Sequence, residues 1–176
     1  KIAKLSQRKF QRAKGQFKLP TPQIIAKSKS QPVRLIMDYV LISRNSQTLT
    51  FPFNLLYNPN NKHYGPTLCV LFALAECDGK YYPVAFDFWT QEEWDPEGFL
   101  SKIKVASLML EGLLEQGLNI KELLFDAGFC SASFLDELDQ LKVPYICRIK
   151  SSWGIQTYGS KRAARSLFGL GKTFFF

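Results

Sequence analysis

The sequence predicts an α/β fold in which strands and helices follow one another in the order β-β-β-α-β-α-β around one mixed sheet. Two patterns indicate this class: short apolar runs rich in β-branched and aromatic residues recur along the chain, and two stretches between them have the spacing of amphipathic helices. The 176 residues suffice for one domain with a tail. The longest apolar run, residues 68–75, is too short to cross a bilayer, so we expect a cytoplasmic protein with no membrane partner.

Basic residues are concentrated at both ends of the chain. Residues 1–34 contain ten Lys or Arg and no acid, residues 35–139 contain six against fifteen acids, and residues 140–176 contain seven and no acid. This distribution is typical of a protein that grips a polyanion at its backbone while carboxylates act nearby. The alternative is a solvated basic tail on an acidic domain.

The first third of the chain predicts an arm, a strand and a long connection. Residues 1–32 are rich in Lys, Arg, Gln and Ser without a sustained helical period, so we expect a basic arm or linker that is partly helical at best. Residues 33–42 form a near-continuous apolar run, as expected of a central strand covered on both faces. Residues 43–66 read as a long polar and aromatic loop of a length typical of functional or disordered segments.

A β-hairpin is predicted in the middle of the chain. Residues 67–76 and 81–89 are strand candidates, and the Asp78-Gly79 pair between them suits a tight type I′ turn. Pro83 cannot donate a hydrogen bond to a neighbouring strand, which places the second strand at a sheet edge.

An amphipathic helix follows the hairpin. Asp95 is the expected N-cap and Pro96 the first helical residue, because these residue types favour those positions. Apolar residues from Phe99 to Leu114 then keep a 3.6-residue period, and Gly117 ends the helix.

The remaining elements complete a core that we assign to residues 33–150. A short strand is predicted over residues 121–125, a helix from Ser133, where residues 133–136 resemble a capping box, and a strand over residues 144–150. Residues 151–176 form a separate segment after this core.

The cysteines do not indicate a zinc site. The four cysteines include no Cys-x-x-Cys pair, and the chain contains one histidine, so a zinc ion would lack ligands. We expect reduced, buried thiols at Cys69, Cys77, Cys130 and Cys147.

Two aspartates are candidate metal ligands. Asp38 lies inside the most apolar strand, where an unpaired carboxylate is costly, and Asp126 ends the strand over residues 121–125. If these strands are neighbours, both carboxylates lie at one edge of the sheet and suit Mg²⁺ or Mn²⁺, the ions that assist phosphodiester displacement. The alternative is structural: Asp126 caps the following turn, and Asp38 pairs with Arg34 or Arg148.

Several basic and aromatic side chains are candidates for contacts with nucleic acid. Arg148 and Lys150 alternate with apolar residues and would share one strand face. The candidate DNA contacts are Arg148, Lys150, Lys161, Arg162, Arg165 and His63. The alternative for all of them is a solvated position. Three tryptophans could stack on an unpaired base, with packing as the alternative, namely Trp89, Trp94 and Trp153.

The region around Asp126 resembles a known family. Residues 123–131, Leu-Leu-Phe-Asp-Ala-Gly-Phe-Cys-Ser, and residues 144–150, Pro-Tyr-Ile-Cys-Arg-Ile-Lys, resemble the second-aspartate region of insertion-sequence transposases of the Asp-Asp-Glu type. Residues 34–38 are similar to the first-aspartate strand of that family.

The resemblance implies a ribonuclease-H-like fold and Mg²⁺-dependent (or Mn²⁺-dependent) cutting and joining of DNA ends. It implies that Asp38 and Asp126 are the first two metal-binding acids. The implied partner is double-stranded DNA, both transposon ends and target, bound by a homodimer at the bacterial nucleoid.

The sequence departs from the family pattern at the third acid. No acid follows Asp139, and residues 151–176 resemble the start of the segment that precedes the family's Glu helix. We therefore expect an incomplete ribonuclease-H-like core, a transposase fragment that is inactive alone. Two other hypotheses stay open: a non-catalytic basic DNA-binding protein with structural acids, and a nuclease of the same fold.

Overall fold

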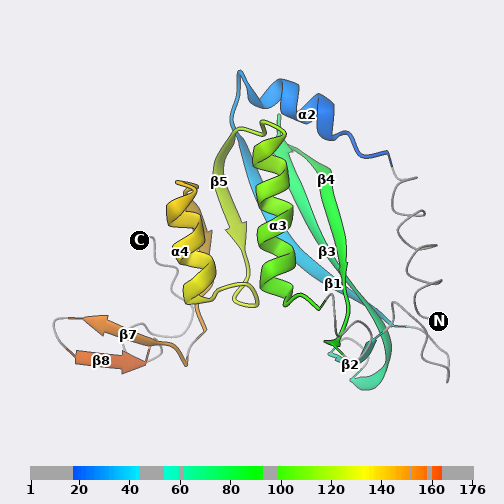
Figure 1. Ribbon diagram of the computed structural model, residues 1–176, viewed down its shortest axis with the longest axis vertical. Coiled ribbons are helices and arrows are strands. Elements are labelled where there is room, and N and C mark those ends of the chain that lie inside the picture. The colour runs from blue at the N-terminus through cyan, green and yellow to red at the C-terminus, as the bar shows by residue number, and fades with distance from the viewer. Residues whose placement is uncertain are drawn as a thin grey trace.

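A mixed six-stranded sheet forms the centre of the molecule (Figure 1). The computed structural model describes residues 18–43, 54–59, 62–92, 99–150, 152–157 and 160–163. The strands of the sheet are β1 (Val33–Ser43), β2 (Asn54–Asn58), β3 (His63–Cys77), β4 (Lys80–Trp89), β5 (Ile120–Phe125) and β6 (Tyr145–Cys147). The helices are α2 (Thr21–Ser28), α3 (Lys102–Glu115) and α4 (Ala132–Gln140), and a separate hairpin pairs β7 (Gly154–Thr157) with β8 (Ser160–Ala163).

The strand order in the sheet is β2-β3-β1-β5-β6, and β4 also pairs with β3. The pairs β1–β3, β2–β3 and β3–β4 are antiparallel, whereas β1–β5 and β5–β6 are parallel. A mixed α/β fold with β1 as a central strand is therefore confirmed. None of the described helices is long and apolar enough to span a membrane.

The predicted hairpin between β3 and β4 is confirmed. Asp78 and Gly79 have φ values of 55° and 68°, and positive φ at both central residues is the type I′ geometry. Pro83 lies in β4, which pairs with β3, and the register shifts between Ala73 and Leu74 next to it. A register irregularity at this point accommodates the missing proline N–H.

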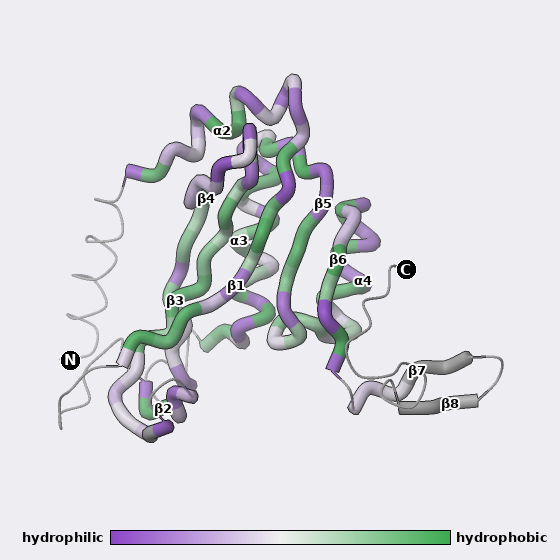
Figure 2. Tube along the Cα trace, turned by 180° about the vertical axis from the view of Figure 1, so that it is seen from behind, coloured by the Kyte–Doolittle hydropathy of each residue, from purple (hydrophilic) through white to green (hydrophobic). Residues whose placement is uncertain are grey.

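The two longer helices cover one face of the sheet, as Figures 1 and 2 show from opposite sides. Val33, Leu35 and Met37 of β1 are buried, whereas the alternating residues Arg34 and Ile36 are partly exposed. The expectation that both faces of this strand are covered is therefore wrong. The main core lies between the sheet and the helices, where α3 contributes Leu110 and Leu113, and α4 contributes Phe134 and Leu138.

Helix α2 lies within the segment expected to be a basic arm. Its buried residues Thr21, Ile24 and Ser28 are spaced as one helical face, a short pattern that the surrounding basic residues obscure. The Thr21 hydroxyl donates a hydrogen bond to the Val84 carbonyl at 2.6 Å, and the Ser28 hydroxyl accepts one from the Asn119 N–H at 3.0 Å. These contacts attach α2 to the sheet; residues 1–17 lie outside the described part of the chain.

The predicted loop over residues 43–66 is partly wrong, because it contains β2 and the start of β3. Asparagine is typical of loops, yet Asn54 is buried at the start of β2. Its side chain forms hydrogen bonds with the backbone at and just after the end of β4. Its Nδ2 donates to the Trp89 carbonyl at 2.9 Å, and its Oδ1 accepts from the Gln91 N–H at 2.6 Å. The polar side chain thus replaces missing backbone partners at the sheet edge.

The predicted cap residues of two helices and the predicted end of one strand differ from the structure. Helix α3 begins at Lys102 with Ser101 as its N-cap, whereas the predicted start, Asp95-Pro96, lies outside the described residues. Gly117, with φ of 88°, follows the end of the helix as predicted. In α4 the capping hydroxyl belongs to Ser131 rather than Ser133 and accepts from the Phe134 N–H at 3.2 Å. Strand β6 ends at Cys147, three residues earlier than expected.

Candidate functional site

The parallel pairing of β1 with β5 brings the two candidate aspartates to the same level of the sheet. The last paired residues of this ladder are Met37 and Phe125, and Asp38 and Asp126 are the next residue on each strand. The condition for a shared site, that these two strands are neighbours, is therefore met. Because side chains alternate along a strand, Asp38 lies on the sheet face of Arg34, opposite the face that α3 covers.

Asp38 is exposed, although its strand is the most apolar in the sequence. One carboxylate oxygen, Oδ1, accepts a hydrogen bond from the N–H of Tyr39 at 2.7 Å. The β1–β5 ladder ends at Met37, so Asp38 has no paired residue on β5, although β1 stays paired with β3 to Ser43. The free-energy cost of desolvating a carboxylate therefore does not arise at this position.

Asp126 lies at the end of β5 beside an arginine from the end of β6. Arg148 Nη1 is 3.5 Å from Asp126 Oδ1, and the two side chains are 85% and 49% exposed, respectively. An ion pair that is long and exposed contributes little to stability. The Asp126 carbonyl also accepts from the Phe129 N–H at 3.0 Å, which closes the turn after the strand. This carboxylate is therefore accessible to a ligand.

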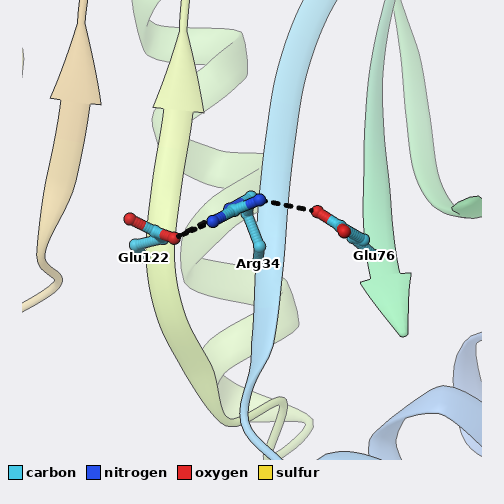
Figure 3. A network of polar contacts seen from close by, with 3 residues as sticks. All are labelled: Arg34, Glu76 and Glu122. Carbon is cyan, nitrogen blue, oxygen red and sulfur yellow. Dashed lines mark hydrogen bonds and ion pairs between the residues drawn. The ribbon is translucent and has the colours of Figure 1, made fainter. Parts of the chain in front are cut away.

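Arg34 is bound to two other acids and leaves Asp38 without the arginine partner suggested for it (Figure 3). Its Nε donates to Glu122 Oε1 at 2.7 Å, and its Nη1 donates to Glu76 Oε2 at 3.0 Å. Glu122, and secondarily Glu76, raise the pKa of Arg34. The three side chains come from three adjacent strands, so the ion triad of Arg34, Glu76 and Glu122 ties β3, β1 and β5 together on this face.

Replacing Arg34 with glutamine should lower the urea midpoint of unfolding, and the difference from wild type should shrink at about 1 M salt, where exposed charges are screened. A neutral amide cannot balance Glu76 and Glu122. The matched variant Lys27→Gln breaks a single exposed ion pair with Asp78, 3.2 Å long, and should change the midpoint less. Equal midpoints for Arg34→Gln and wild type at low salt would contradict the stabilising role of the triad.

The turn after Asp126 packs directly against the residue that follows Asp38. A Cβ atom added to Gly128 would lie 3.2 Å from Tyr39 Cε1, and the Phe129 ring meets the Tyr39 ring edge to face at 5.8 Å. Any side chain larger than that of glycine at position 128 would therefore require the Tyr39 ring to shift. The Asp126 turn is thereby held against β1, which fixes the relative position of both carboxylates.

A lysine that sequence reasoning missed packs on the same tyrosine. Lys102 Nζ is 4.7 Å from the centre of the Tyr39 ring and 4.6 Å from that of the Trp89 ring. Burial chiefly raises the pKa of Tyr39, and the charges of Asp126 and Asp38 add to the rise. Lys102 therefore contacts the aromatic ring of the residue that directly follows Asp38. The signal for Lys102 was hidden by the wrong start predicted for its helix.

The remaining predicted DNA contacts are spread over the second half of the chain and the start of β3. Arg148 and Lys150 are exposed, but they follow the end of β6, so their predicted place on one strand face is wrong. Lys161 and Arg162 lie in β8, His63 begins β3, and Arg165 lies outside the described residues.

The two tryptophans that the structure describes support the packing alternative rather than stacking on a base. Trp89 donates from Nε1 to the Leu100 carbonyl at 3.1 Å, and Trp153 packs against the core. Trp94 lies outside the described residues.

The candidate metal site consists of two carboxylates. Within the described residues, no group of three or more His, Cys, Asp or Glu side chains is placed to bind a metal ion. Glu137 of α4 points toward α3 instead, where its Oε2 accepts from the Ser107 hydroxyl at 2.6 Å. Two acidic oxygen donors on rigid strands fit a hard divalent cation that keeps part of its water shell.

Comparison with known proteins finds similarity among solved structures. No protein-family model and no curated protein sequence matches the chain. The piggyBac transposase synaptic complex with hairpin DNA aligns with a TM-score of 0.47 and 16% identity over 68% of this chain and 23% of the transposase. The Drosophila P element transposase strand transfer complex aligns with a TM-score of 0.31 and 12% identity over 77% and 33%, respectively. The chain thus spans at most a third of the length of each of these proteins.

Proposed function

We propose that this chain forms part of the ribonuclease-H-like catalytic core of a DNA transposase, in which Asp38 and Asp126 bind Mg²⁺ or Mn²⁺. The observation that carries the proposal is the parallel β1–β5 register, which sets both aspartates at one level of the sheet. The sequence resemblance around Asp126 supports the same assignment. We further propose that the protein acts on double-stranded DNA as a homodimer.

The residues around the carboxylates have complementary roles in this proposal. A divalent ion held there would supply Lewis-acid chemistry, because its charge would stabilise negative charge that develops on the oxygens of a phosphodiester. Asp38 and Asp126 supply negative oxygen ligands, and the Tyr39 N–H orients the Asp38 carboxylate. Arg148, released from its long contact with Asp126, would bind a DNA phosphate. A complete two-metal site requires further acidic ligands beyond this pair.

Titration with Mn²⁺ tests the metal site directly. The double variant Asp38→Asn/Asp126→Asn should bind Mn²⁺ at least about tenfold more weakly than wild type, because each amide removes a charged ligand. The matched control Asp136→Asn/Asp139→Asn removes the same charge from exposed positions of α4 and should bind like wild type. Equal affinities of the two double variants, measured by calorimetry, would refute the proposed site.

The second candidate function is metal-independent DNA binding, which the exposure of Arg148 and Lys150 and the net charge of +8 favour. Such binding weakens steeply with salt. If DNA affinity of the wild-type chain is the same with and without Mn²⁺ and is unchanged in Asp38→Asn/Asp126→Asn, this second function holds and the first does not.

A further inference from the structure

Two cysteines are in contact next to the Asp126 turn (residues 126–129): Cys130 directly follows this turn in the sequence, and its sulfur contacts that of Cys147. The Sγ atoms of Cys130 and Cys147 are 3.6 Å apart. Cys130 lies between the turn and α4, and Cys147 is the last residue of β6, paired with Phe125 of β5. Cys147 is partly exposed, which corrects the expectation that all four thiols are buried. The contact brings together residues 17 positions apart in the sequence.

We propose that Cys130 and Cys147 form a redox modification site at which a peroxide converts the two thiols to an intramolecular disulfide. The sulfur of Cys147, a partly exposed residue, attacks the peroxide. The S–O bond forms as the O–O bond breaks, and one water leaves. The Cys130 sulfur then attacks Sγ of Cys147, the S–O bond breaks, and a second water leaves. The balance is two thiols and one hydrogen peroxide to one disulfide and two waters.

Proximity, rather than high intrinsic reactivity, selects this pair. Burial raises the pKa of Cys147 to about 12, and the neighbouring Cys130 adds to the rise. Burial also raises the pKa of Cys130, while Cys147 and the charge of Lys150 act in the opposite direction. The small thiolate fraction at neutral pH makes the first step slow. Once Cys147 is oxidised, the adjacent Cys130 sulfur completes the bond within the same molecule.

The disulfide would join the end of the Asp126 turn to the end of β6. Cys130 follows Asp126 by four residues, and Cys147 directly precedes Arg148. The cross-link closes a loop that contains α4 and constrains the backbone on both sides of the Asp126–Arg148 contact. The proposal is independent of the metal site, since it requires only the two sulfur positions.

Peptide mapping of the whole chain tests the proposal. The protein is treated with hydrogen peroxide, its remaining thiols are blocked, and it is digested with trypsin without reductant. Peptide 122–142, which contains Cys130, should then be linked to peptide 143–148, which contains Cys147. The mass of the linked product should equal the sum of the two peptide masses minus two hydrogen atoms. Cys69 and Cys77 share peptide 63–80 and provide an internal control. Both should stay reduced during the peroxide treatment and should therefore carry the blocking reagent. Separate blocked or over-oxidised forms of Cys130 and Cys147, with no linked peptide, would overturn the proposal.

Unfolding in urea provides a second readout that does not depend on peptide recovery. Peroxide should raise the urea midpoint of wild type, and a reducing dithiol should reverse the shift. The variants Cys130→Ser and Cys147→Ser should show no such rise, whereas Cys69→Ser should show it. If a variant fails to fold, the peptide map of wild type still decides. An unchanged wild-type midpoint after oxidation contradicts the constraint on the backbone.

Discussion

Replacing Phe134 with alanine should lower the free energy of unfolding by about 3–5 kcal/mol, the range for truncating a buried phenylalanine. Phe134 is 1% exposed, and its ring meets that of Phe125 edge to face at 5.3 Å. Truncation therefore removes an aromatic pair and leaves a cavity between α4 and β5. Because Phe125 directly precedes Asp126, the cavity also loosens the strand end that carries the candidate ligand.

Urea unfolding monitored by circular dichroism measures this effect. The variant Phe134→Leu retains an apolar side chain and should cost about 1.5 kcal/mol or less. A loss for Phe134→Ala no larger than that for Phe134→Leu would show that the ring does not anchor α4.

Leu123→Ala should lower the free energy of unfolding by about 2–5 kcal/mol. Leu123 is 0% exposed and lies at the middle of the parallel ladder, paired with Leu35 of β1 and Tyr145 of β6. The rigid strands on both sides prevent the site from collapsing onto the smaller side chain, so most of the cavity remains.

The matched control for this variant is Leu108→Ala on the solvent side of α3. Leu108 is 44% exposed, and its truncation should change the free energy of unfolding by about 0.5 kcal/mol or less. Chemical denaturation of both variants gives the comparison. Similar losses for Leu123→Ala and Leu108→Ala would contradict the placement of β5 in the core.

The parts of the fold that sequence predicts well are those with local causes. The hairpin is predictable because Asp78 and Gly79 tolerate positive φ, a property of the residues themselves. The start of α3 is not, because Asp95-Pro96 and Ser101 both carry valid start signals, and the Lys104 N–H bonded to the Ser101 hydroxyl identifies Ser101 as the cap. Strand β2 was missed because Asn54 finds its partners across the fold, at Trp89 and Gln91.

The positions of the two candidate aspartates follow from the sequence, whereas the surroundings of these residues do not. Residue type and strand position pointed to Asp38 and Asp126. The exposure of Asp38 depends on where β5 ends beside β1, which no pattern within residues 33–42 encodes. The packing of Lys102 on Tyr39 likewise joins residues from two distant elements, a helix start and a strand.

The ion triad also constrains the alignment of the two aspartates. Arg34 precedes Asp38 by four residues, and Glu122 precedes Asp126 by four. The β1–β5 ladder therefore places the oppositely charged Arg34 and Glu122 side by side, and four residues later it places the two negatively charged aspartates at one level. A slip of one residue would turn the Glu122 side chain to the opposite face and separate it from Arg34. The attraction between Arg34 and Glu122 therefore favours the alignment in which the Asp38 and Asp126 carboxylates stand level, although both carboxylates are negatively charged.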